Sequence, residues 1–227
     1  MKTRNNTRVS IVLQIMLQID PVKRRIIDGA EELFLKYGIK TVTMDDIARF
    51  LSMSKKTIYH YFKDKNEIVN TVSTTHLEKE RLKIESVQNS SKNAIEELLQ
   101  LSKCIRENIN GVNPTVFHDL KKYYNESWDI YMHYRSHVFY YSILSTLKNG
   151  IKNGYFREEI DPEILAILRM EEIQMLFNSE AFPRNKYDFK VVQQQFADHF
   201  IHGILTTKGK KIYSRYLTKM KNNETSN

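Results

Sequence analysis

The stretch MSKKTIYHYFKDK, residues 53–65, concentrates hydrogen-bonding side chains on a segment with few apolar residues. Its polar side chains include Lys55, Lys56, Tyr59, His60 and Tyr61. In a helix, the apolar Ile58 and Phe62 lie about 40° apart, and Lys56 and His60 project to the opposite side. Such a helix docks by one narrow face and offers donors outward, as contact with phosphates and base edges in a DNA major groove requires.

The flanking residues predict the elements that hold this helix. Ser54 is expected to cap its start, and Asp64 is expected to cap a longer helix that follows it. Thr43 and Asp46, three residues apart, predict a capping box at the start of a short preceding helix. Two short helices joined by a tight turn, the second polar and basic, are typical of a helix-turn-helix. The alternative is an ordinary basic surface helix.

A first helix is predicted to begin at Asp20 and Pro21 and to end at Gly38. Residues 41–69, TVTMDDIARFLSMSKKTIYHYFKDKNEIV, resemble the DNA-binding segment of the TetR/AcrR family of bacterial repressors, and Ile26 to Gly38 resembles that family's first helix. Ser52 and Lys56 depart from the family's pattern, because glycine is common at both places.

The resemblance implies a role for each matching residue. Thr43 and Lys65 would contact phosphates at helix starts, and Tyr59 and Tyr61 would grip the DNA backbone. The base-contacting residues would be Lys55, Lys56, Thr57 and His60. With the capping residue Ser54, the expected DNA-binding set is Thr43, Ser54, Lys55, Lys56, Thr57, Tyr59, His60, Tyr61 and Lys65.

Composition favours an all-α fold with an N-terminal helix-turn-helix domain joined to a larger helical domain. The chain has 227 residues, 41% of them hydrophobic, with only 7 glycines and 4 prolines to supply turns. Its one cysteine, Cys104, cannot form an internal disulfide, so a cytoplasmic location is the default. Residues 1–70 hold 13 Lys and Arg against 8 Asp and Glu, and residues 208–227 hold 6 against 1. Positive ends around a near-neutral middle favour a polyanion partner such as double-stranded DNA, although solvated lysines would give the same count.

Periodicity predicts further helices beyond residue 85. Helices are expected from Asn93 to Ile109, from Thr115 to Tyr124, over about 126–150, after Asp161 and Pro162, and, as the last large helix, over about 188–206. The expected domains are an N-terminal extension at 1–20, the DNA-binding domain at 21–68, a ligand-binding and dimerisation domain at 69–220 and a tail at 221–227.

Apolar residues crowd segment 164–177 beyond what one buried stripe requires, and Val192, Phe196 and Phe200 give the helix at 188–206 a matching face. In the family, the corresponding two helices pair with their copies across a two-fold axis. The resemblance therefore implies a homodimer on a palindromic operator. The alternative is that both helices are central helices of a monomer.

Nine of the 25 aromatic residues fall within residues 117–141. Aromatic rings with polar ends suit the wall of a ligand cavity, although an aromatic stripe at helical spacing also suits a core. The predicted lining of a site for a small hydrophobic or aromatic ligand is Phe117, Tyr124, Trp128, Tyr131 and Met132.

Catalytic and metal-binding motifs are not found in the sequence. His133 and His137 stand one helical turn apart, but no third metal ligand is evident. There is no glycine-rich phosphate loop and no Gly-x-Ser-x-Gly turn, so we expect no enzyme, no metal and no cofactor. Three functions remain: a ligand-responsive repressor, a DNA-binding regulator without a small-molecule ligand, and a helical adaptor or enzyme that inherited the fold.

Residues 9–19, VSIVLQIMLQI, follow basic residues as a secretory signal does, but they lack its small-residue cleavage site. They are also too few to span a bilayer, which takes about 20 apolar residues, so no membrane association is expected. One interpretation is an additional helix that packs on the body or a partner. The other is that translation starts at Met16 and residues 1–15 are not native.

Overall fold

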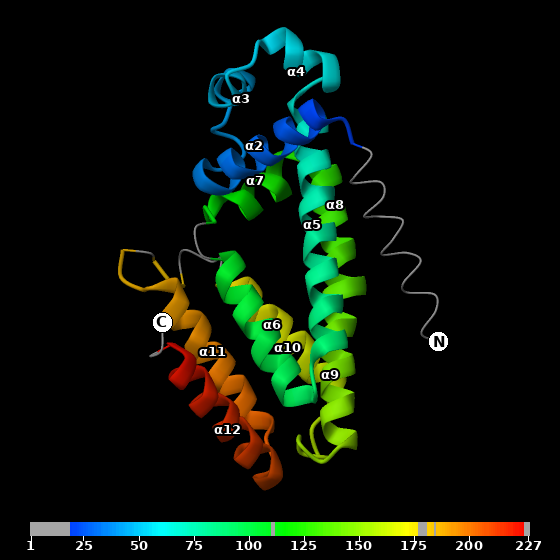
Figure 1. Cartoon of the computed structure of the whole chain (residues 1–227), viewed down its shortest axis with the longest axis vertical. Coiled ribbons are helices and arrows are strands. Elements are labelled where there is room, and N and C mark those ends of the chain that lie inside the picture. The colour runs from blue at the N-terminus through cyan, green and yellow to red at the C-terminus, as the bar shows by residue number, and fades with distance from the viewer. Residues whose placement is uncertain (1–18, 110–111, 177–180, 184, 225–227) are drawn as a thin grey trace. The chain divides into compact units, whose positions relative to one another are not determined.

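The computed structural model describes residues 19–109, 112–176, 181–183 and 185–224. This part of the chain is helical, with an isolated bridge between Phe156 and Leu205 as its one extended pairing, so the all-α prediction is confirmed (Figure 1). Within the same residues, no helix combines the length and the apolar character needed to cross a bilayer. The predictions for residues 1–18 lie outside the described chain.

The helices follow one another closely along the chain. They are α2 (Pro21–Tyr37), α3 (Met44–Leu51), α4 (Lys55–Tyr61), α5 (Lys65–Ser90), α6 (Ala94–Ile109), α7 (Thr115–Tyr123), α8 (Asn125–Tyr134), a π-helix η1 (Arg135–Phe139), α9 (Tyr140–Lys152), α10 (Pro162–Met175), α11 (Phe189–Ile204) and α12 (Thr207–Glu224).

Helix starts are fixed by the polar residues that the sequence singled out. The Asp20 carboxylate accepts the Val22 N–H at 2.7 Å, and the Asp161 carboxylate accepts the Glu163 N–H at 2.8 Å, each beside a proline in the first turn. Asn93 Oδ1 accepts the N–H groups of Ile95 and Glu96. These bonds satisfy amides that have no partner within their own helix, so the predicted starts are confirmed.

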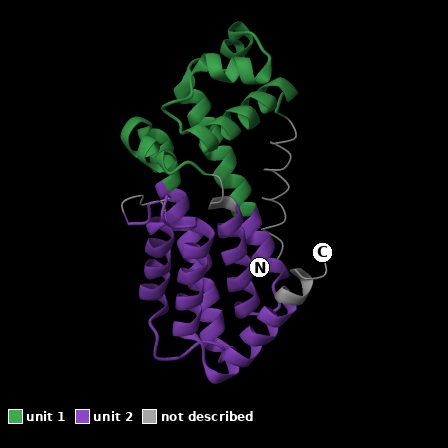
Figure 2. Cartoon of the chain, turned by 90° about the vertical axis from the view of Figure 1, so that its left-hand side faces the viewer, with its two compact units in different colours: residues 1–82, 112–131 green, residues 83–111, 132–227 purple. Residues whose placement is uncertain are grey.

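The described chain forms two compact units (Figure 2). Unit 1 comprises residues 19–82 and 112–131, and unit 2 comprises residues 83–109 and 132–224. Unit 1 extends beyond the expected domain boundary at residue 68, because Val116 and Leu120 of α7 belong to the same buried cluster as the helix-turn-helix core.

Charged side chains join α2 to α5 within unit 1. The Glu31 carboxylate on α2 is 2.6 Å from His76 Nδ1 and 2.7 Å from Lys79 Nζ, and both partners lie on α5. Burial alone would raise the pKa of Glu31, but the hydrogen bonds from His76 and Lys79 outweigh it and lower that pKa to about 2. The carboxylate therefore stays ionised and holds the first helix on the fourth.

Unit 2 is a helical bundle whose main buried cluster includes Ile143, Leu147, Phe200 and Ile204. The predicted long helix over about 126–150 is present as α8, η1 and α9 in direct succession, with a π-helical turn in its middle. The prediction that the helix near 188–206 is the last large one is wrong, because α12 follows α11 with 18 residues. Thr206 Oγ1 accepts the Gly209 N–H at 3.0 Å, and Tyr213 in α12 is buried.

Candidate nucleic-acid interface

Helix α4 is held at its start by Ser54. The Thr57 N–H donates to Ser54 Oγ at 3.0 Å, and the two hydroxyl groups are 2.8 Å apart. The predicted cap is therefore present, and it also sets the direction of the Thr57 side chain, which is half-buried. Both residues stand at the helix end where backbone N–H groups favour anions such as phosphates.

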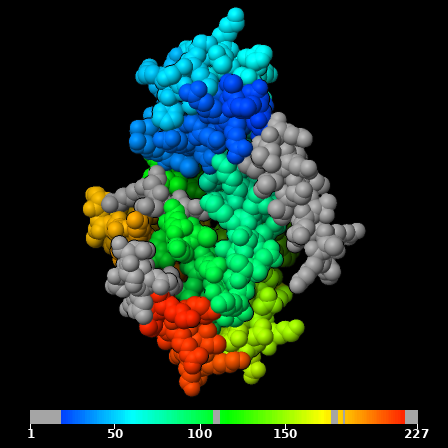
Figure 3. All heavy atoms as spheres, viewed as in Figure 1, coloured from blue at the N-terminus to red at the C-terminus, as the bar shows by residue number. Residues whose placement is uncertain are grey.

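The two sides of α4 differ as the sequence predicted. Ile58 and Phe62 are buried in the core of unit 1, at 0% and 1% exposure. Lys56, Tyr59 and His60 are exposed, and in the space-filling view the cyan side chains of α4 stand at the surface of unit 1 (Figure 3). The helix is thus anchored by two apolar side chains and presents hydrogen-bonding groups outward.

The two lysines of α4 are not equivalent. Lys55 Nζ lies 2.7 Å from the Asp45 carboxylate on α3, and this hydrogen bond raises the pKa of Lys55. A phosphate or base that binds Lys55 must therefore compete with Asp45. Lys56 is exposed, and no hydrogen bond or ion pair to another described residue restrains it. Lys56 is the free cation of this helix.

The turn between α3 and α4 contains Ser52, whose φ of 53° and ψ of 43° are left-handed. Among the described residues it is the one non-glycine residue with positive φ. Its N–H donates toward the last carbonyls of α3, and Arg25 of α2 donates to the Leu51 carbonyl at 2.7 Å. A Cβ added at Gly29 would lie 2.6 Å from Leu51 Cδ2, so a side chain there would displace the Leu51 side chain that packs α3 on α2. These contacts fix the angle at which α4 leaves α3.

Thr43 and Asp46 form the predicted capping box. Asp46 N–H donates to Thr43 Oγ1 at 3.2 Å, while the Asp46 carboxylate accepts from the Thr43 hydroxyl at 2.6 Å and from the Thr43 N–H at 2.9 Å. Hydrogen bonds from the Thr43 hydroxyl and then from its N–H lower the pKa of Asp46. The expected phosphate contact of Thr43 stays a prediction, and it would have to share a hydroxyl that is already engaged.

Lys65, expected at a phosphate, points into unit 1 instead of standing free. Its Nζ donates to the Ile39 carbonyl at 2.6 Å and to the Lys40 carbonyl at 3.3 Å. It also lies about 6 Å from the Phe34 and Tyr124 rings. Burial lowers the pKa of Lys65, and the charges of Asp119 and Asp46 oppose that effect. The geometry gives Lys65 a structural task, which is to hold the loop between α2 and α3.

Asp119 of α7 binds the same loop, and no sequence motif predicted this contact. Its buried carboxylate accepts the Lys40 N–H at 2.8 Å, and Lys40 Nζ donates to Tyr123 at 2.9 Å. A Cβ added at Gly38, where φ is 85°, would lie 2.4 Å from Thr115 of α7. The position of α3 therefore depends on α7, whose Asp119 lies 79 residues beyond Lys40.

Of the two aromatic residues flanking His60, only Tyr59 is freely exposed, at 50%. Tyr61 is half-buried against the core of unit 1, and burial and then the neighbouring Asp20 carboxylate raise its pKa. The His60 ring meets the Tyr61 ring edge-on at 5.1 Å. A backbone grip by Tyr61 stays a prediction, as does base contact by His60.

The predicted ligand-lining residues are brought together in part. The Tyr131 ring lies 5.1 Å from Phe117 and 5.3 Å from Trp128, and Tyr124 and Trp128 pack against the buried cluster of unit 1. Met132 is 37% exposed and opens the second segment of unit 2. Two hollows in unit 2, of about 330 and 160 Å³, are lined by other residues. A ligand at the aromatic residues stays a prediction.

His133 and His137 stack their rings 4.2 Å apart on one helix face. In the described ranges, no three potential metal ligands come together, so the structure offers no donor set for a metal site there.

Comparison with known proteins places these features in a family. Residues 26–72 match the family of bacterial regulatory proteins described as tetR. The chain is 23% identical to the HTH-type transcriptional regulator YvaF of Bacillus subtilis over 185 residues, which cover 80% of this chain and 94% of YvaF. It is 33% identical to the HTH-type regulator YhgD of the same organism over 69 residues, or 30% of this chain and 36% of YhgD.

Solved structures share the fold. A Saccharomonospora viridis transcriptional regulator in complex with choline matches with a TM-score of 0.70 at 21% identity, over 81% of this chain and 97% of that one. The fatty acid degradation regulator FadR of Bacillus halodurans matches with a TM-score of 0.66 at 18% identity, over 82% and 97%. From the exposed helix α4, the capped helices that support it and these matches together, we conclude that the chain carries an N-terminal DNA-binding domain of the TetR family and is a transcriptional regulator.

Proposed function

We propose that this regulator is a repressor that binds a palindromic operator as a homodimer in the cytoplasm and is released by a small molecule. The observation that carries the proposal is the exposed set Lys56, Tyr59 and His60 above the buried Ile58 and Phe62. A short basic helix anchored in this way fits the major groove, where lysine reads guanine and the tyrosine hydroxyl reaches phosphates.

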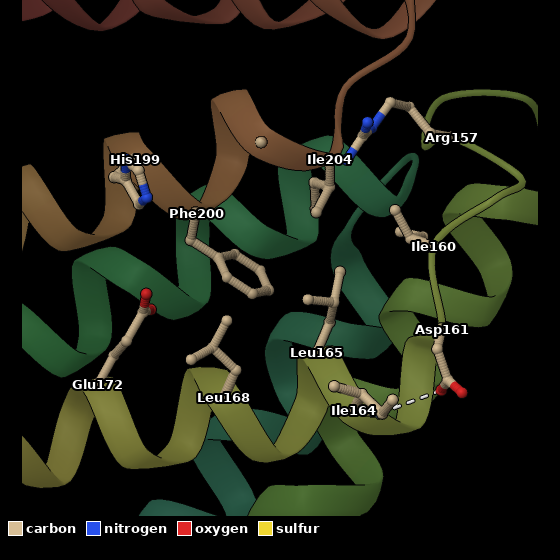
Figure 4. A pocket seen from close by; sticks show the side chains of 11 residues that line it. Arg157, Ile160, Asp161, Ile164, Leu165, Leu168, Glu172, His199, Phe200 and Ile204 are labelled. Atoms are coloured by element: carbon tan, nitrogen blue, oxygen red, sulfur yellow. Dashed lines mark hydrogen bonds between the residues drawn. The ribbon is translucent and has the colours of Figure 1, made fainter.

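Exposed apolar side chains on α10 and α11 support the homodimer. Ile164, Ile167, Leu168 and Met175 on α10 and Val191 on α11 are between 45% and 64% exposed. The hollow of about 330 Å³ beside them has an apolar floor that includes Leu165, Phe200 and Ile204, with Arg157, Glu172 and His199 at its edge (Figure 4). A second copy would bury this surface, and an isologous pair carries two recognition helices related by a two-fold axis. Such symmetry calls for a palindromic site.

Ligand release is supported by the kinds of proteins that share the fold. They include a regulator in complex with choline, a ketosteroid transcriptional regulator and a regulator of fatty acid degradation. The three proteins are described by different small molecules or pathways, so they support release by a small molecule without identifying that molecule. The aromatic group around Trp128 and Tyr131 would contribute one wall of the ligand site.

The decisive experiment is binding to the DNA that flanks the coding region, measured at several salt concentrations. We expect binding to one or two discrete sites with two-fold symmetry, and an affinity that falls steeply with salt. Equal binding to flanking and random DNA would contradict the operator. Sedimentation tests the dimer: the wild type should be a dimer at micromolar concentration, and Ile167→Asp should be a 27.0 kDa monomer. A ligand screen that changes neither Trp128 fluorescence nor DNA affinity would refute release by a small molecule.

A further inference from the structure

A second hollow in unit 2, of about 160 Å³, lies between α6, α11 and α12. These three helices pack side by side (Figure 1). The hollow borders Gln193, Ala197 and Ile201 of α11, whereas the hollow beside α10 borders His199 and Gly203 of the same helix. The two hollows therefore lie on different faces of α11, and the second is separate from the surface assigned to the dimer.

Gln193 is the unusual group in this hollow. It is 2% exposed, and its Nε2 donates to the Ser102 carbonyl at 3.0 Å. With the amide fixed by that bond, its Oε1 acceptor is left without a hydrogen-bond partner in the described part of the protein. Buried acceptors almost always have a donor, because leaving one unpaired costs free energy. Gln193 lines the hollow, but its Oε1 has almost no accessible surface, so a donor in the hollow reaches that atom only after a small shift of the side chain.

Two opposite charges line the same hollow. Asp198 accepts the Tyr213 hydroxyl at its Oδ1 at 3.0 Å, and a carboxylate has capacity for further donors. Arg106 donates from Nη1 to Gln194 at 3.0 Å, and a guanidinium carries five N–H groups in all. Gln194 and Asp198 are one helical turn apart on α11, roughly 6 Å along its axis. Arg106 and Asp198 both line the hollow, and Arg106 is bonded to a residue that lies one helical turn from Asp198.

From this arrangement we propose that the hollow binds a small α-amino acid in its zwitterionic form. The ammonium group would donate to Asp198 and to the unpaired Gln193 Oε1, and the carboxylate would accept from Arg106. A short apolar side chain would lie against the remaining wall, which is formed by Leu99, Ile201 and Leu217. One water needs roughly 10–15 Å³ of such space, so the hollow holds a molecule of roughly ten non-hydrogen atoms at most.

Calorimetric titration of the full chain tests the ligand class with three matched probes. L-alanine carries both charges, propionate lacks the ammonium group, and ethylamine lacks the carboxylate. We expect saturable binding of L-alanine at one site per chain, and at least ten-fold weaker binding of propionate and of ethylamine. Equal binding of all three, or binding of none, would overturn the proposal.

Variants test the site itself. Asp198→Asn keeps an acceptor for Tyr213 but removes the charge, and Arg106→Met removes the guanidinium while keeping an unbranched stem of similar length to that of arginine. Each should weaken L-alanine binding at least ten-fold, and Gln193→Leu should do the same. The matched control is Gln195→Leu, because Gln195 is an exposed glutamine on the same helix. Unchanged binding in all three site variants would place the ligand elsewhere and refute the assignment.

DNA binding is read separately, so that this proposal and the proposed ligand response can fail independently. If L-alanine binds and also lowers operator affinity in the wild type but not in Asp198→Asn, the hollow is a regulatory site. If L-alanine binds without changing operator affinity, the binding site stands and this amino acid is not the releasing ligand.

Discussion

The inward position of Lys65 leads to a prediction that separates a structural lysine from a phosphate-binding one. In Lys65→Met, the bond to the Ile39 carbonyl at 2.6 Å is lost, and so is the weaker bond to the Lys40 carbonyl at 3.3 Å. Hydrogen bonds from charged donors contribute about 1.5–3 kcal/mol, and the methionine recovers part of that loss because it buries no charge. We expect the free energy of unfolding to fall by about 1–3 kcal/mol.

The assay is urea unfolding followed by the fluorescence of Trp128, which is the single tryptophan and packs on the core of unit 1. With a slope of about 2 kcal/mol per M, the midpoint should fall by about 0.5–1.5 M. Lys63→Met is the control, because Lys63 is an exposed lysine two residues earlier and its midpoint should not move. Operator binding of folded Lys65→Met should keep the salt dependence of the wild type.

A lysine that only contacts phosphate would give the opposite pattern. The unfolding midpoint of Lys65→Met would then coincide with that of the wild type, and the salt dependence would fall by about one phosphate per half-site. That pair of results would refute the structural role of Lys65.

Three further substitutions test other parts of unit 1. Lys56→Ala should relax base preference at two symmetric operator positions by about 1–3 kcal/mol in a panel of operator variants, and an equal loss on random DNA would place Lys56 on the backbone instead. Glu31 contributes stability that is present above pH 4.5 and is lost as the pH falls toward about 2. Its depressed pKa corresponds to about 3 kcal/mol, so urea midpoints between pH 3 and 6 should fall less steeply in Glu31→Gln than in the wild type, while exposed Glu32→Gln should follow the wild type. Ser52→Gly should relieve about 1–2 kcal/mol of left-handed backbone strain, but the glycine also makes the unfolded chain more flexible, which offsets part of that gain. Calorimetry should therefore show a Tm that is higher by about 2 °C. An unchanged Tm would contradict the strain at Ser52.

Local features of the fold were predictable because their causes lie within a few residues of each other. Asp20, Ser54 and Asp161 cap amides two or three positions away, and Ile58 and Phe62 share a face through helical spacing alone. At Ser52, where glycine is common in the family, the serine nevertheless adopts the left-handed conformation.

The orientation of Lys65 was not predictable, because the carbonyl groups that it binds lie 25 and 26 residues away in the chain. The loop that carries these carbonyls is in turn held by Asp119 of α7. The same applies to Asp119, whose partner Lys40 is 79 residues distant. Helix α12 is different, since a signal was present. Thr206 is a capping residue, and Ile212, Tyr213, Tyr216 and Leu217 have helical spacing, but six basic residues after 207 also fit a charged, solvated end of the chain.

The ion pair between Lys55 and Asp45 bears on how the protein distributes itself over a chromosome. A genome offers on the order of 10⁶ to 10⁹ sites of wrong sequence, and each unpaired cation on a recognition helix raises the affinity for all of them alike. The Asp45 carboxylate is a counter-ion for Lys55 within the protein itself, so it partly cancels the attraction of Lys55 to random DNA. Loss of Asp45 would strengthen binding everywhere and leave fewer molecules free to find the operator.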